Sequence, residues 1–199
     1  MNAEQLHKTL RASQYAEQVL GNHVLLLEQD YAIDQFLVPL STTQIQNLIH
    51  SALDNISDET TWMCAIRVLR ARLMFRWIWQ DANQLTDVVT LTRELSDFAD
   101  ASICAAKDFA RVPLVLKYGE PIGYSGTVQD LIVVAMGKLG AQELNLSSDI
   151  DLIFAFGEQG ETNGRKCIDV QQFCILWGQK LIYLLDHMTA DGFVFRVDM

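Results

Sequence analysis

The first half of the chain has the hydrophobic spacing of helices. After Ser57 and Asp58, either of which is a suitable helix cap, apolar residues recur at steps of three and four and so share one helix face. These residues are Trp62, Ala65, Ile66, Leu69, Leu73 and Trp77. A second helix of the same kind is predicted from Leu85 to Ala106, and shorter helices around 3–20 and 42–53.

Four arginines and two tryptophans of the predicted helix need an explanation of their own. The arginines, which fall mostly off the apolar stripe, form either a phosphate or partner surface or a solvated helix face, and the pattern favours the solvated face. They are Arg67, Arg70, Arg72 and Arg76. Trp77 and Trp79 are two residues apart and cannot share a face, so we expect Trp77 in the core and Trp79 at a domain or partner contact.

The second half of the chain is much richer in glycine than the first. Of the 11 glycines, Gly21 alone precedes Gly119. The segment 118–130, with Pro121 and three glycines, is the predicted linker. Beyond it the pattern predicts strands at 130–136 and 149–156, separated by a glycine turn and a short polar helix, then a helix from about Asp169 and a last strand at 193–198. The expected fold class is therefore α+β, with a helical region at 1–117 and a mixed core at 118–199.

Charge and composition exclude several classes of protein. With 15 Lys and Arg against 25 Asp and Glu, the net charge of −10 makes the chain a poor partner for nucleic acid. No apolar run approaches membrane-spanning length, so no membrane role is expected. The 4 cysteines form no CxxC pair and no zinc signature. We therefore expect free thiols and a cytoplasmic location.

Two carboxylates mark the candidate chemistry. Asp149 and Asp151 begin the apolar strand predicted at 149–156, and strand alternation places both on one face while Ile150 and Leu152 occupy the other. Such a pair repels itself unless a cation neutralises it, and hard oxygen ligands suit Mg²⁺ or Mn²⁺. A D-x-D pattern alone is weak evidence, so its surroundings decide.

Those surroundings suggest phosphate chemistry. Gly137, Lys138 and Gly140 follow the preceding strand, where glycine allows backbone N–H groups to approach a phosphate and lysine adds positive charge. Ser148 directly precedes the acidic pair. Neither a P-loop nor a dinucleotide fingerprint is present, and an ordinary strand-to-helix turn is the alternative interpretation of the glycines.

The last predicted strand supplies a third acid. Alternation places Arg196 and Asp198 on one face, and if this strand lies beside that of Asp149, three carboxylates and a guanidinium meet. Three acids can hold two cations that assist an in-line displacement at phosphorus. Arg196 would either steady phosphate charge or pair with Asp198.

These segments resemble a known family. A strand, glycine turn, helix and D-x-D strand with a later third Asp is similar to the polymerase beta-like nucleotidyltransferases. More closely, MGKLGAQELNLSSDIDLIF and DGFVFRVDM resemble the bifunctional glutamine synthetase adenylyltransferase/adenylyl-removing enzymes. Asn145, the F-R-V-D-M string and the long helical stretch before the motif resemble the N-terminal, AMP-removing half of that family, truncated at its C-terminal end.

The resemblance implies a reaction and its residues. Inorganic phosphate would attack the AMP phosphorus of adenylyl-tyrosine on glutamine synthetase and release ADP, so that the protein regulates nitrogen assimilation. Asp149, Asp151 and Asp198 would be the catalytic, metal-binding acids, with Mg²⁺ or Mn²⁺ and the nucleotides ATP or ADP as ligands. Gly137, Lys138, Gly140 and Ser148 would line the phosphate loop. The PII signalling protein is the regulatory partner that the resemblance implies.

The sequence also departs from the family pattern. Ala141 stands where the family usually has glycine, which matters only if that position needs a positive φ or close phosphate approach. Family members continue after V-D-M, so the chain is expected to be an N-terminal fragment. Three alternatives stay open: AMP transfer from ATP to glutamine synthetase, nucleotide transfer to another acceptor, and a regulatory fragment without catalysis.

Overall fold

A computed structural model describes residues 3–21 and 38–199. Within those ranges it contains five helices of ten or more residues, a one-turn helix and five short strands, so the α+β prediction is confirmed. The helices are α1 (Ala3–Ala12), α4 (Thr42–Leu53), α5 (Glu59–Ala82), α6 (Val88–Tyr118), α7 (Gly137–Gly140) and α8 (Val170–Asp186). The strands are β1 (Pro121–Gly123), β2 (Ile132–Ala135), β3 (Ile150–Ala155), β4 (Gly160–Thr162) and β5 (Val197–Asp198). Residues 14–21 are also helical.

The described chain forms two compact units. Unit 1 takes the described residues up to Phe98 together with Gln142–Ser148, and unit 2 takes Ala99–Ala141 and Asp149–Met199. The two units are defined by the contacts within each of them and not by family domain boundaries. The predicted domain boundary after residue 117 therefore stays a prediction. No helix in the described part of the chain is long and apolar enough to cross a membrane. All four cysteines are free thiols.

Helix α5 is the centre of unit 1. Asp58 caps it by accepting a hydrogen bond from the Thr61 N–H, which confirms one of the two predicted caps. Both Trp77 and Trp79 are buried. Trp77 belongs to the core as predicted, whereas Trp79 packs with Ala16 and Val19 in a hydrophobic cluster. Its placement at a domain or partner contact was therefore wrong, because the segment 14–21 covers that side of α5.

The predicted solvated arginine face of α5 was also wrong. Arg67 and Arg76 are buried, and Arg70 and Arg72 are half-buried. Arg67 Nη1 donates to the Met63 carbonyl, while burial lowers the pKa of Arg70, which donates to the Tyr15 hydroxyl. Helices α1 and α4 pack on α5, and Glu94 and Tyr15 contact its arginines, so these charged side chains have partners inside the protein.

A buried polar network holds unit 1 together. Arg76 Nη1 lies 2.6 Å from Glu94 Oε2, and the indole N–H of Trp77 donates to the same oxygen at 2.7 Å. The second oxygen of Glu94 accepts from the Leu40 N–H, and Arg76 Nη2 donates to the Val38 carbonyl. One ion pair thus joins α5, α6 and the segment before α4.

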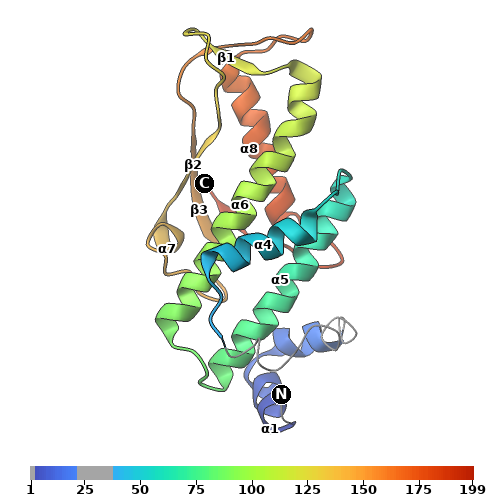
Figure 1. Cartoon of the computed structure of the whole chain (residues 1–199), viewed down its shortest axis with the longest axis vertical. Helices are drawn as coiled ribbons and strands as arrows, with labels where there is room; N and C mark the ends of the chain where they lie inside the picture. Colours follow the sequence, from blue (N-terminus) through green and yellow to red (C-terminus); the bar gives the residue numbers. More distant parts are fainter. Residues whose placement is uncertain (1–2, 22–37) are drawn as a thin grey trace. The chain divides into compact units, whose positions relative to one another are not determined.

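Unit 2 packs a small sheet against α8. Strand β2 pairs antiparallel with β3, and β3 pairs parallel with β5, while β1 and β4 form a separate antiparallel pair. Asp169 caps α8 through the Gln172 N–H. A Cβ at Gly178 would lie 2.6 Å from the Phe154 ring, so α8 needs glycine where β3 meets it. Figure 1 shows β2 and β3 edge-on, with α8 beside them.

Three sequence-based element predictions need correction in unit 2. The predicted linker contains β1, which pairs with β4. The Gly137–Gly140 turn is itself the helix α7, and no helix follows it before β3. The last strand covers only Val197–Asp198, because the N–H groups of Val194 and Phe195 both donate to the Leu185 carbonyl at the end of α8.

Candidate functional site

Strand β3 presents the D-x-D segment as the alternation predicts. Ile150 and Leu152 are buried, whereas Asp151 is exposed on the opposite face. Asp149 lies one residue before the strand and is half-buried. The pleat therefore anchors the strand through its apolar side chains and leaves the Asp151 carboxylate available for chemistry.

The pairing of β3 with β5 brings the third acid to the same place. In this parallel ladder Asp151 is the register partner of Asp198, and the Ile150 N–H donates to the Arg196 carbonyl at 3.0 Å. Both aspartates are exposed. Residues far apart in sequence thus become neighbours at one edge of the sheet, which is the arrangement the sequence required for a shared site.

Gly137 lies against the Asp151 carboxylate. It has φ +53°, and a Cβ built on it would clash with Asp151 Oδ2. Helix α7 packs on β3 at this point. The glycine is therefore required twice, by its backbone conformation and by the space that the carboxylate occupies.

The rest of the glycine loop is built for close packing. The Gly140 N–H donates to the Met136 carbonyl, and a Cβ at Gly140 would lie 2.6 Å from the Ala135 carbonyl oxygen. Ala141 has φ −86°, and the positive φ falls on the next residue, Gln142, at 59°. Alanine in place of the family's glycine therefore costs no backbone strain here. Lys138 is exposed.

Ser148 closes a polar turn before β3. Its Oγ accepts from the Asn145 N–H at 3.3 Å, and the Asn145 side chain accepts from the Ser147 N–H at 3.1 Å. Residues 142–148 belong to unit 1, whereas the carboxylates belong to unit 2, so we describe the turn separately from the carboxylates. Its contribution to phosphate binding stays a prediction.

Arg196, for which phosphate contact and pairing with Asp198 were the two predicted roles, lies against Asp149. Its Nε lies 2.5 Å from Asp149 Oδ1, in an ion pair whose side chains are 58% and 37% exposed. Asp149 Oδ1 has no hydrogen-bond partner, so this contact is an ion pair without hydrogen-bond geometry. The same oxygen is shielded from solvent. The predicted pairing with Asp198 was wrong, because the chain before Val197 is not a strand and does not alternate.

Comparison with known proteins decides the family. The family model described as glutamate-ammonia ligase adenylyltransferase matches residues 3–199. The chain belongs to this family. The resemblance to the bifunctional glutamine synthetase adenylyltransferase/adenylyl-removing enzymes is thereby confirmed.

Relatives agree along the whole chain. The bifunctional glutamine synthetase adenylyltransferase/adenylyl-removing enzyme of Acinetobacter baylyi is 77% identical over 199 residues, which is 100% of this chain and 22% of that protein. Proteins of the same name from Pseudomonas aeruginosa and Shewanella frigidimarina are 40% and 38% identical over 98% and 100% of this chain, and over 20% and 21% of their own lengths. The chain thus spans about a fifth of the relatives it matches.

The carboxylates of this adenylyltransferase family member are of the hard oxygen type that divalent cations prefer, but the described part of the chain does not group three of them as a metal site. Asp151 and Asp198 offer hard oxygen donors in register, and Asp149, whose Oδ1 is shielded and paired with Arg196, is a third acid just before the start of the same strand. Within residues 3–21 and 38–199, no three His, Cys, Asp or Glu side chains are grouped closely enough to hold a metal. Asp149 would have to exchange its Arg196 contact for the cation.

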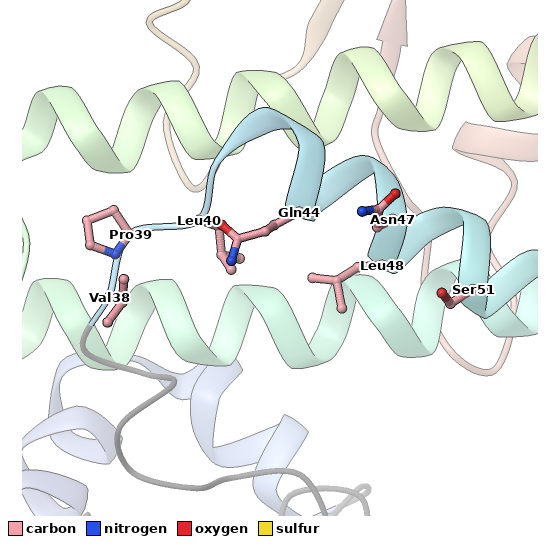
Figure 2. A pocket seen from close by; sticks show the side chains of 7 residues that line it. All are labelled: Val38, Pro39, Leu40, Gln44, Asn47, Leu48 and Ser51. Carbon is pink, nitrogen blue, oxygen red and sulfur yellow. The ribbon is translucent and has the colours of Figure 1, made fainter.

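Unit 1 holds a separate cavity of about 570 Å³. Figure 2 shows the side chains that line it, which come from the segment Val38–Leu40 and from α4, with Gln44, Asn47 and Ser51 as the polar ones. No charged side chain lines it, and none of the predicted site residues does. The cavity is therefore no part of the carboxylate site.

Sequence reasoning overlooked two residues beside the carboxylates, Val134 and Ile153. They lie opposite each other on β2 and β3, and both are exposed. A signal was present: β3 is apolar at nearly every position, although only one face of it meets α8.

Proposed function

We propose that this chain carries the AMP-removing site of an adenylyltransferase that acts on glutamine synthetase. One observation carries the proposal: the β3–β5 register sets Asp198 beside Asp151, with Gly137 held against the Asp151 carboxylate. Family membership supports nucleotidyl chemistry, and the relatives' names include both AMP transfer and AMP removal. Asn145 and the F-R-V-D-M string favour removal.

The proposed reaction is a phosphorolysis. An oxygen of inorganic phosphate forms a bond to the AMP phosphorus, the bond from phosphorus to the tyrosyl oxygen breaks, and a proton passes to that oxygen. The products are ADP and unmodified glutamine synthetase. Bound Mg²⁺ or Mn²⁺ would neutralise phosphate charge and assist both attack and departure.

Each of the candidate site residues has a proposed role in this reaction. Asp149, Asp151 and Asp198 would hold the cation once Asp149 leaves its Arg196 contact, and Gly137 fixes the position of Asp151. Lys138 follows Gly137 in the chain, and Arg196 forms an ion pair with Asp149. Both are exposed cations, and they would attract the phosphate groups of the nucleotide. Gly140 keeps α7 close to β2, and Ser148 would complete the loop.

The biological setting follows from the same proposal. Glutamine synthetase is the substrate named for the relatives. We propose the PII signalling protein as regulator, control of nitrogen assimilation as the role, and the cytoplasm, where the free thiols persist, as the location. Nucleic acid is not a proposed ligand.

Formation of ADP from adenylylated glutamine synthetase tests the proposal. The assay supplies inorganic phosphate with Mg²⁺ or Mn²⁺ to this chain, to a version extended past Met199, and to the Asp151→Asn variant of each. Asp108→Asn, which changes an exposed acid on α6, is the matched control. ADP that disappears only with Asp151→Asn supports phosphorolysis.

Two other outcomes of this assay would support a different function. Consumption of ATP with modification of glutamine synthetase, without ADP release from the adenylylated form, would assign the opposite transfer to this chain. Binding of glutamine synthetase that survives Asp151→Asn, with no turnover by any version, would identify a regulatory fragment.

A further inference from the structure

The sheet that carries Asp151 and Asp198 has an apolar face on the side of the carboxylates. Along β2 and β3 the residues on this side are Ile132, Val134, Met136, Asp151, Ile153 and Ala155. Ile132, Val134 and Ile153 are 48%, 42% and 50% exposed. We call Ile132, Val134 and Ile153 the apolar platform.

The register makes the platform continuous with the carboxylates. Val134 is the cross-strand partner of Ile153, and the Met136 N–H donates to the Asp151 carbonyl one step further along the same ladder. Ile153 follows Asp151 by two residues on one strand, so their Cα atoms are about 7 Å apart. A ligand with phosphorus at the carboxylates therefore reaches the platform with its next chemical group.

The exposure of the platform is unusual for this kind of sheet. An antiparallel pair with one packed face normally turns polar side chains to water on the other. Here the packed face is already used, since Ile150 and Leu152 are buried and the Phe154 ring lies against Gly178 of α8. In the described part of the chain, the aliphatic side chains on the second face are available as an apolar contact surface beside Asp151.

The chemistry of the platform selects among the groups of the substrate. Its three side chains offer no hydrogen-bond donor or acceptor, whereas adenine and ribose carry polar atoms that need partners when they leave water. The tyrosyl ring is joined to phosphorus through its own oxygen, so its remaining surface is apolar and directly adjacent to the reacting bond.

We propose, on the basis of the proposed function, that the apolar platform receives the aromatic ring of adenylyl-tyrosine and that Val134 and Ile153 determine specificity for tyrosine. The ring lies across the two side chains while the phosphate stays at Asp151 and Asp198. Selectivity for an aromatic acceptor then comes from contact area rather than from hydrogen bonds.

Two peptide substrates that differ in one group test this inference. One carries adenylyl-O-tyrosine and the other adenylyl-O-threonine, so both present AMP and only one presents a ring. The enzyme is the longest natural form of the polypeptide that carries this sequence, and kcat and KM are measured for ADP formation with phosphate.

Ile153→Ala should lower kcat/KM for the tyrosyl peptide by roughly tenfold and leave that for the threonyl peptide unchanged, because only the ring loses contact area. Ile153→Leu should keep most of the activity. Leu116→Ala is the matched control, since Leu116 is an aliphatic side chain that is 82% exposed on α6 rather than on the sheet. It should change neither substrate.

The inference and the proposed function fail in different ways. Equal losses for both peptides, or no loss for either, would overturn the platform and leave phosphorolysis standing. If the unaltered enzyme released ADP from neither peptide nor from adenylylated glutamine synthetase, the proposed function would fail and the inference with it.

Discussion

The charged residues of the two units show opposite solutions to the same problem. In unit 1, Arg76 and Glu94 are buried and bound to each other, to Trp77 and to backbone groups. In unit 2, Asp151 and Asp198 lie exposed and in register on neighbouring strands. The first arrangement satisfies its charges internally, whereas the second leaves two like charges side by side.

This difference separates structure from chemistry. A buried pair with complete partners restricts the conformation of the helices around it and offers nothing to a ligand. Two exposed carboxylates repel each other and gain from a bound cation. We therefore expect changes in unit 1 to affect folding and changes at the β3–β5 edge to affect activity.

Removal of Glu94 should have the largest effect on stability. Glu94→Ala would leave the Arg76 guanidinium buried without its counter-charge, at a cost of about 3–5 kcal/mol. Denaturant unfolding measures the change in the free energy of unfolding. A loss below about 1 kcal/mol would contradict the view that this network holds unit 1 together.

Neutralising the third acid should have the largest effect on catalysis. Asp198→Asn is expected to lower ADP formation at least about a hundredfold, because one oxygen ligand of the cation loses its charge. Stability should be unchanged or slightly higher, since repulsion with Asp151 is relieved. Thermal unfolding beside the activity assay separates the two effects, and a parallel loss of both would show that Asp198, like Glu94, supports folding.

Gly137→Ala should have a smaller effect, of about tenfold on activity. The added methyl group would push the Asp151 carboxylate from its place and strain a backbone with φ +53°. Gly126→Ala is the matched control, because Gly126 has φ +83° but open space around it. If both variants lose equal activity, backbone strain rather than displacement of Asp151 is the cause.

The smallest effect is expected at an exposed ion pair of unit 2. Lys107 Nζ lies 2.6 Å from Asp130 Oδ2, and the Asp130 side chain is 65% exposed. Asp130→Asn should change the free energy of unfolding by less than about 1 kcal/mol, because water screens the pair. The same denaturant experiment used for Glu94→Ala gives this value, and a cost near that of Glu94→Ala would show that burial is not what distinguishes the pairs.

Local patterns predicted the parts of the molecule that depend on local forces. Alternation identified β3 and the outward direction of Asp151, and the caps at Asp58 and Asp169 mark the starts of α5 and α8. The last predicted strand supplied the third acid, the family resemblance implied its metal-binding role, and the β3–β5 register places it beside Asp151.

The errors arose where distant segments decide. Burial of Arg76 depends on Glu94, which lies on another helix, so α5 alone gave no sign of it. The last strand was overestimated because the Leu185 carbonyl draws the preceding N–H groups to the end of α8. The apolar platform was overlooked because a strand that is apolar on both faces looks like an ordinary buried strand.

The parallel pairing of β3 with β5 has a consequence for how the protein folds. These strands meet only after the chain has passed through β4 and the whole of α8, so the contact closes a long loop. Contacts of high sequence separation form late, after the local helices. The carboxylate pair should therefore be among the last features to assemble, and a partly folded chain would not yet contain the site.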